Sequence, residues 1–161
     1  VENAALRDVL RVHLDRFDAD VRPALSALPQ GWIHGDSNAW NVLVEEHEDG
    51  RSVSGLIDFG DLAHTVRVAD VAVALGYALL RHDDASGARA LLAGYESVLS
   101  LQPAERALLP HLAPLRLVVS VAMSAAARQR DPDNAYLSAD AAPAAAWLSN
   151  HGPGPLDALL D

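Results

Sequence analysis

Between residues 32 and 44 the sequence reads W-I-H-G-D-S-N-A-W-N-V-L-V, and this stretch decides how the chain is interpreted. It places a carboxylate, Asp36, five residues before a carboxamide, Asn41, and a β-branched run typical of a strand follows directly. A second such run ends in G-L-I-D-F-G-D at residues 55–61, where Asp58 comes just after the strand. The sequence therefore puts three oxygen-bearing side chains at the ends of two short strands.

The two strand-like stretches, over residues 42–45 and 53–57, predict a β-hairpin, because the dipeptide Asp49-Gly50 between them favours a tight turn. Helical periodicity dominates the rest of the chain, with Pro23 expected to interrupt the first helix. Pro110 and Pro114 are expected to end or kink the fourth. The predicted helices cover residues 4–28, 67–82, 86–99, 103–130 and 135–149.

Phosphoryl transfer from a nucleotide requires a carboxylate within reach of the attacking hydroxyl and oxygen ligands for magnesium. Asp36, Asn41 and Asp58 are side chains of the right kinds for these roles. An isolated Asp followed by Asn is more often a turn or a cap than a catalytic pair. Here a His-Gly pair before the acid, a strand after the amide and an I-D-F-G at the far end of the hairpin accompany it, which favours the functional interpretation.

This arrangement resembles the aminoglycoside phosphotransferase and choline kinase superfamily, whose signature is an H-G-D-x4-N loop followed by an I-D-F/W segment. The two motifs stand at residues 34–41 and 57–59. The resemblance implies that Asp36 is the catalytic base or hydroxyl-orienting residue, and that Asn41 and Asp58 bind Mg²⁺ together with ATP or GTP. The flanking residues look closest to small-molecule kinases of the hydroxylysine kinase kind.

The resemblance also implies the fold: an α+β, mostly helical, protein-kinase-like C-terminal lobe with a small β-hairpin carrying the catalytic and metal residues. Residues 1–161 are expected to form a single domain, with the N-terminal nucleotide-gripping lobe absent. The chain contains no lysine, so it cannot supply the phosphate-anchoring Lys of that lobe. We therefore expect the chain alone to be inactive, and a longer parent protein to act on a small, amine-containing hydroxyl acceptor.

Three further residues are candidates for supporting roles. By resemblance His34 packs behind the catalytic loop and holds it by hydrogen bonds. Asp70 is the only charged residue from Val68 to Leu80, so its buried carboxylate requires a partner. The resemblance suggests the loop backbone or His34, and a helix N-cap is the alternative. Asp61 could support the metal or face an amine, or be a solvated turn residue.

Composition limits the remaining classes of function. A formal net charge of -10 argues against a nucleic-acid partner, because such partners are held by clustered Lys and Arg. No cysteine is present, which fits the cytoplasm, and the longest apolar runs are shorter than the roughly 20 residues that cross a membrane. We therefore expect neither a nucleic-acid nor a membrane partner.

Two other functions compete with a kinase. One is a non-catalytic, kinase-like module that binds a ligand without transferring phosphate. The other is a helical metal-dependent phosphohydrolase with His82-Asp83 as a metal dyad, although the other histidines lack the spacing of paired ligands.

Overall fold

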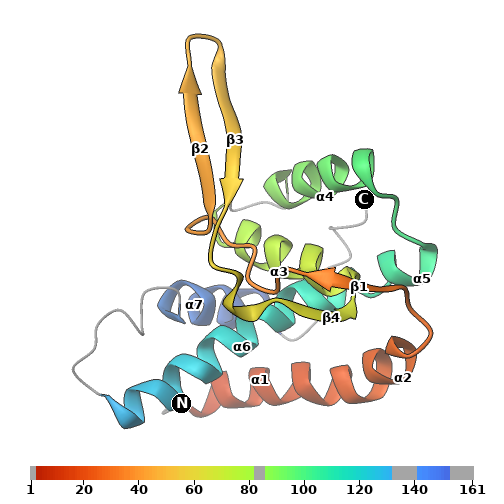
Figure 1. The fold of residues 1–161 in the computed structure, drawn as a ribbon. Coiled ribbons are helices and arrows are strands. Elements are labelled where there is room, and N and C mark those ends of the chain that lie inside the picture. The colour runs from red at the N-terminus through yellow and green to blue at the C-terminus, as the bar shows by residue number, and fades with distance from the viewer. Residues whose placement is uncertain (1–2, 82–85, 132–140, 153–161) are drawn as a thin grey trace.

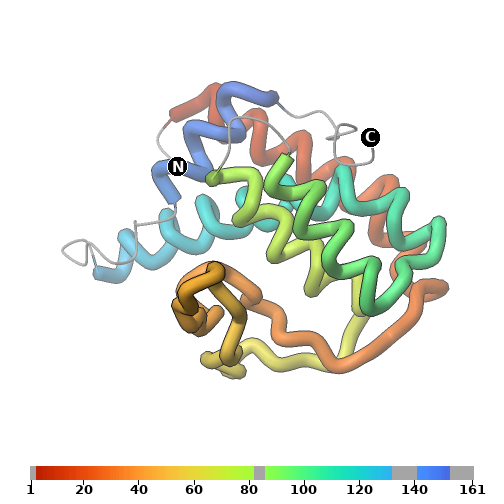
Figure 2. Tube along the Cα trace, turned by 90° about the horizontal axis from the view of Figure 1, so that it is seen from above, coloured from red at the N-terminus to blue at the C-terminus, as the bar shows by residue number. Residues whose placement is uncertain are grey.

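Helix α3 (Val68–Leu79) is apolar around most of its circumference, and it lies at the centre of the helical body for that reason. The computed structural model describes residues 3–81, 86–131 and 141–152. Figure 1 shows α3 between α4 (Ser86–Val98) and α6 (Leu109–Arg130), and in Figure 2 α1 (Ala4–Arg16) and α7 (Ala141–His151) lie on the far side of α6. The mostly helical α+β class expected from the sequence is confirmed.

The core divides into two neighbouring clusters that share α6. The larger surrounds α3, whose Leu75 is fully buried, and includes Leu92 of α4. The smaller joins α1 and α7 to α6 through Leu10, Leu117 and Leu148. By length and composition alone the 22-residue α6 could cross a membrane, but its buried side chains pack in these clusters, as in the core helix of a folded domain.

The predicted first helix is three consecutive elements. Asn3 caps α1 by accepting a hydrogen bond from the Leu6 amide on its Oδ1 at 3.2 Å. A π-helical turn, η1 (Phe17–Val21), then leads into α2 (Arg22–Leu25), where Pro23 stands in the first turn. The expected interruption near Pro23 is therefore confirmed. The physical reason is that proline, which has no amide proton, fits the start of a helix better than its interior.

In the part of the chain that the structure describes, two antiparallel pairs of strands make up the β structure, and they lie on one side of the helical body (Figure 2). The predicted hairpin is present as β2 (Val42–His47) and β3 (Gly50–Leu56), with a bulge at Leu43/Val44. It projects away from the helices in Figure 1, and most of its residues are exposed. The second pair, β1 (Gln30–Ile33) with β4 (Ala63–Val66), was not predicted.

The predicted helix over residues 103–130 is wrong as a single element. It is divided into α5 (Pro103–Arg106) and α6, and Pro110 stands in the first turn of α6 rather than ending a helix. This position needs no amide hydrogen bond, so proline is favourable there. Pro114 lies inside α6, which continues through it. The expected helix from residue 135 is described only from residue 141 onward, as α7.

A buried ion pair joins the start of α3 to α5. Glu105, which is 0% exposed, accepts hydrogen bonds from Arg67 Nε at 2.8 Å and Nη2 at 2.7 Å. It also accepts from the Gln102 amide at 2.8 Å, completing a capping box. The Arg67 guanidinium, through these hydrogen bonds, lowers the pKa of Glu105 below its usual value.

We expect Glu105→Gln to flatten the acid dependence of stability. The folded-state pKa of Glu105 lies below the unfolded value of 4.5, so the pair stabilises the fold above that pH. This stabilisation is lost as the pH falls through the folded pKa. Urea unfolding at about pH 7 and about pH 3 should therefore show a smaller loss of unfolding free energy for Glu105→Gln than for the unmodified chain. Glu46→Gln, in an exposed pair with Arg51, is the control and should lose as much as the unmodified chain.

We expect Gly76→Ala to destabilise the fold by about 1–3 kcal/mol, because the added methyl group overfills a close helix contact. A Cβ at Gly76 would lie 2.8 Å from the Ala113 carbonyl oxygen and 2.9 Å from Arg116 Cβ, both on α6. The matched control is Gly94→Ala in α4, where nothing lies within 4 Å of the added atom. That variant should be neutral or slightly stabilising in urea unfolding, and equal effects of the two variants would contradict the close contact.

Candidate functional site

The candidate site is built on the loop of residues 34–41, between β1 and β2. Gly35 begins its turn with a φ of +82°, and a Cβ there would lie 2.5 Å from the Asp61 backbone oxygen. Only glycine fits this conformation and this close approach. Gly35 therefore allows the loop to pack against η2 (Phe59–Asp61), the turn that follows the hairpin.

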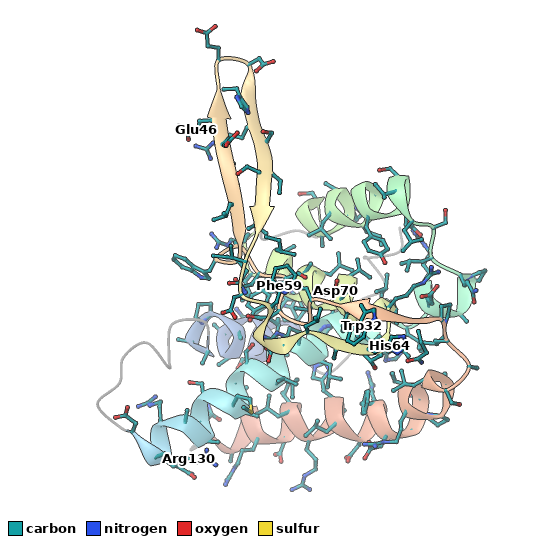
Figure 3. The ribbon with its side chains drawn as sticks, in the orientation of Figure 1. Trp32, Glu46, Phe59, His64, Asp70 and Arg130 are labelled. Atoms are coloured by element: carbon teal, nitrogen blue, oxygen red, sulfur yellow. The ribbon has the colours of Figure 1, made fainter. Side chains whose placement is uncertain are left out.

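Asp70, in the first turn of α3, holds the loop to the helical body. Its Oδ1 accepts hydrogen bonds from the Gly35 amide at 3.0 Å and from the Ser37 hydroxyl at 3.1 Å. Of the partners that the sequence left open, the structure has the loop backbone, with the Ser37 hydroxyl added; the residue at the N-cap of α3 is Arg67. Figure 3 places Asp70 and Phe59 at the base of the hairpin, where the strands meet the helices.

His34 ties the loop to the segment after the hairpin. Its Nε2 donates to the Ile57 carbonyl oxygen at 2.9 Å, which leaves Nδ1 to accept from the Asp36 amide at 3.3 Å. Its ring packs edge-on against Phe59 at 4.8 Å between centroids. His34 is only 5% exposed, and both of its ring nitrogens are hydrogen-bonded to backbone groups.

The Asp36 carboxylate is held on both oxygens. Oδ2 accepts from Asn38 Nδ2 at 2.8 Å and from Asn41 Nδ2 at 3.1 Å. Oδ1 accepts from Arg116 Nη2 at 2.8 Å, an ion pair across 80 residues of sequence. Asn41 Nδ2 also donates to the Asp36 backbone oxygen at 2.9 Å, so the amide group is bound through its nitrogen.

Asp58 follows directly after Ile57, whose backbone is bonded to Asn41. The Ile57 amide donates to the Asn41 carbonyl oxygen at 2.9 Å, one residue before Asp58. Asp58 adopts a left-handed conformation with a φ of 63°, which Asp tolerates better than most residues, and its Oδ1 accepts from the Gly60 amide at 3.4 Å. Its carboxylate is exposed, as is Asp61, which meets the loop through its backbone.

The site residues flank the hairpin rather than lie in its strands. Asp36 and Asn41 precede β2, and Asp58 follows β3 by two residues. The hairpin therefore brings two short loop segments together at its base. Among the residues that the structure describes, no cluster of three His, Cys, Asp or Glu side chains suits a metal ion. The alternative dyad at His82-Asp83 lies outside the described residues.

A cavity of about 470 Å³ lies against the loop, and we name it the loop cavity. Its walls come from the loop (Asn38, Trp40), the hairpin (Val44), helix α3 (Tyr77) and the turn after that helix (Arg81). Asn38, which lines the loop cavity, also donates a hydrogen bond to the Asp36 carboxylate, so this carboxylate lies one residue away from the cavity wall. The cavity volume lies within the range of small-molecule sites.

Arg116 and Tyr77 were missed by the sequence interpretation. Arg116 is the only charged residue between Leu112 and Ala127, the same signal that singled out Asp70 in its apolar helix. The sequence did not indicate the partner of Arg116, because Asp36 lies 80 residues away and periodicity gives no information on long-range contacts.

Comparison with known proteins shows the family to which the chain belongs. The sequence profile described as "Phosphotransferase enzyme family" matches residues 2–111, and the chain belongs to that family. Hydroxylysine kinase of Mus musculus is 31% identical over 134 residues, covering 80% of this chain and 36% of the relative. Homoserine kinase of Gluconacetobacter diazotrophicus is 42% identical over 110 residues, 65% of this chain and 33% of the relative.

The chain thus spans about a third of the length of these curated relatives. No solved structure gives a significant match. The expected resemblance to the aminoglycoside phosphotransferase type, and to kinases of the hydroxylysine kinase kind, is confirmed at the level of family.

We expect Asp70→Ala to release the loop. Removing the carboxylate leaves the Gly35 amide and the Ser37 hydroxyl without their acceptor, at a cost of about 1–3 kcal/mol. Amide hydrogen exchange at Gly35 should become faster, and the unfolding free energy should fall. Asp18→Ala removes an exposed carboxylate paired with Arg22 and is the control; it should change neither measurement. Unchanged protection at Gly35 in Asp70→Ala would contradict this role.

Proposed function

We propose that this chain is the C-terminal lobe of a kinase that transfers the γ-phosphate of ATP or GTP to a hydroxyl group of a small, amine-containing molecule. The observation that carries the proposal is the bonded arrangement of Asp36, Asn41 and the segment of Asp58. Asn41 binds Asp36 through its side chain and Ile57 through its backbone, so one residue links the two motifs.

The side chains at this point fit a hard divalent cation. Asn41 donates to Asp36 through Nδ2, so its Oδ1, on the opposite side of the amide group, remains available as a ligand. Asp58 adds an exposed carboxylate. One carboxylate and one amide oxygen suit Mg²⁺, which keeps several waters. When bound, the ion would supply positive charge that neutralises the negative charge of the nucleotide phosphates.

Asp36 is assigned the acceptor hydroxyl. With Oδ1 on Arg116 and Oδ2 on two amides, the carboxylate keeps a fixed orientation and still has lone pairs for one more donor. Phosphoryl transfer depends mainly on positioning and charge stabilisation, so a rigid carboxylate suits the role of orienting the hydroxyl and accepting its proton.

The names of the relatives support the acceptor class. Hydroxylysine and homoserine are amino acids that carry both an amine and a hydroxyl group. The loop cavity has a volume suited to a molecule of that size and lies against the loop that carries Asp36. We propose that the non-reacting part of the acceptor binds there.

A second lobe completes the proposal. Large apolar side chains are exposed on the hairpin and on the turn after it, among them Val53 at 72% and Phe59 at 55%. Exposed apolar groups gathered in one region commonly mark a contact surface. We propose that an N-terminal lobe carrying the phosphate-anchoring Lys covers them, since this chain has no lysine.

The test is a phosphotransfer assay with ATP, Mg²⁺ and either homoserine or hydroxylysine, using the longer protein that includes this chain. Asp36→Asn should lower kcat by about 10²–10⁴-fold, because it removes the carboxylate that orients the hydroxyl and accepts its proton. Asp18→Asn, far from the loop, is the control and should retain full kcat.

Two outcomes would contradict the proposal. Full activity in Asp36→Asn would favour the non-catalytic ligand-binding module. Turnover by residues 1–161 alone, equal to that of the longer protein, would contradict the requirement for a second lobe.

A further inference from the structure

Arg116, on α6, binds Oδ1 of Asp36, whereas the side-chain amides of Asn38 and Asn41 bind Oδ2. Its Nη2 donates to Asp36 Oδ1 at 2.8 Å and to the Tyr77 hydroxyl at 2.6 Å. The guanidinium lies over the Tyr77 ring, 5.1 Å from its centroid. The side chains of the ion pair are 21% and 22% exposed, so water screens it less than it screens a surface pair.

The stem of Arg116 is positioned by helix packing. At Gly76 the helices α3 and α6 approach so closely that a Cβ would lie 2.9 Å from Arg116 Cβ. Tyr77, the next residue of α3, supplies the ring and hydroxyl that hold the guanidinium. The charged group therefore rests on two rigid helices, whereas its partner Asp36 lies in a loop.

We propose that Arg116 is a positioning residue for phosphoryl transfer, which sets the orientation of the Asp36 carboxylate and links it through Tyr77 to the wall of the loop cavity. The inference rests on the function proposed above. Rotation of the carboxylate would break either the bond to Arg116 or those to the loop amides. A reaction that depends on the placement of a hydroxyl is sensitive to such rotation.

The hydrogen bonds of Arg116 differ from those of the buried structural pair. Arg67 binds Glu105 through Nε and Nη2 and also donates to the Ser100 carbonyl oxygen. Arg116 keeps Nε buried with no hydrogen-bond partner in the described part of the chain. Leaving a buried donor unpaired costs about 1–3 kcal/mol. Arg116 is therefore expected to stabilise the fold less than Arg67, whose guanidinium makes more hydrogen bonds.

The kinetic test compares Arg116→Met with Asp36→Asn in the longer protein, under the assay given above. Arg116→Met should lower kcat by about 100-fold, because a misplaced reacting group costs about that much, while the KM for ATP stays unchanged. Arg116→Ala should recover part of its kcat when methylguanidinium is added. Arg22→Met, in an exposed pair with Asp18, is the surface control and should keep both constants.

Arg67→Met is the structural control. It should lower the Tm, because it leaves Glu105 buried without its charged partner, and methylguanidinium should leave its kcat unchanged. If Arg116→Met lowers the Tm as Arg67→Met does, and Arg116→Ala does not respond to methylguanidinium, Arg116 is only a structural residue and the inference is wrong.

A spectroscopic measurement on residues 1–161 tests the contact without any activity. Nitrogen-detected NMR should resolve a slowly exchanging guanidinium signal of Arg116, and Asp36→Asn should abolish it. Absence of that signal in the unmodified chain would overturn the inference. Loss of kcat in Asp36→Asn with full kcat in Arg116→Met would overturn it and leave the proposed kinase function standing. Full kcat in Asp36→Asn would overturn both.

Discussion

The site depends on the carboxylate of Asp70, because it is the contact that ties a polar loop to a helix buried in the core. Two donors of the loop, the Gly35 amide and the Ser37 hydroxyl, converge on one oxygen of that carboxylate. A charged group in an otherwise apolar helix is costly unless it is paired. The two hydrogen bonds therefore stabilise the Asp70 carboxylate in its apolar helix and also fix the loop.

Around this contact the site consists of loop segments that are held in place by hydrogen bonds to one another. Gly35 permits the turn, His34 bonds the loop to Ile57, and Asn41 bonds it to the hairpin side. Each of these bonds has a backbone group as donor or acceptor. Substitution of neighbouring side chains would therefore leave much of the loop geometry in place, which suits a family that varies its acceptors.

Local patterns in the sequence were enough to predict the hairpin, the buried α3 and a paired Asp70. Each rests on short-range information: alternation, a turn dipeptide, or one charge in an apolar run. The pairing of β1 with β4 was not predictable in this way, because two four-residue strands held together across the loop have no periodic signal. The contact of Arg116 with Asp36 was missed for a related reason, since nothing local indicates which distant residue a lone charge will meet. Pro110 was misjudged because its local signal does not distinguish the first turn of a helix from the last.

The long sequence separation within the ion pair at Asp36 has a consequence for synthesis. Contacts between residues far apart form late, after the local helices. In a nascent chain emerging from the ribosome, Asp36 is present long before α6 has been made, and the guanidinium that completes the ion pair comes only with α6. The order of translation thus delays the ion pair at Asp36 until α6, the helix shared by both core clusters, has been made.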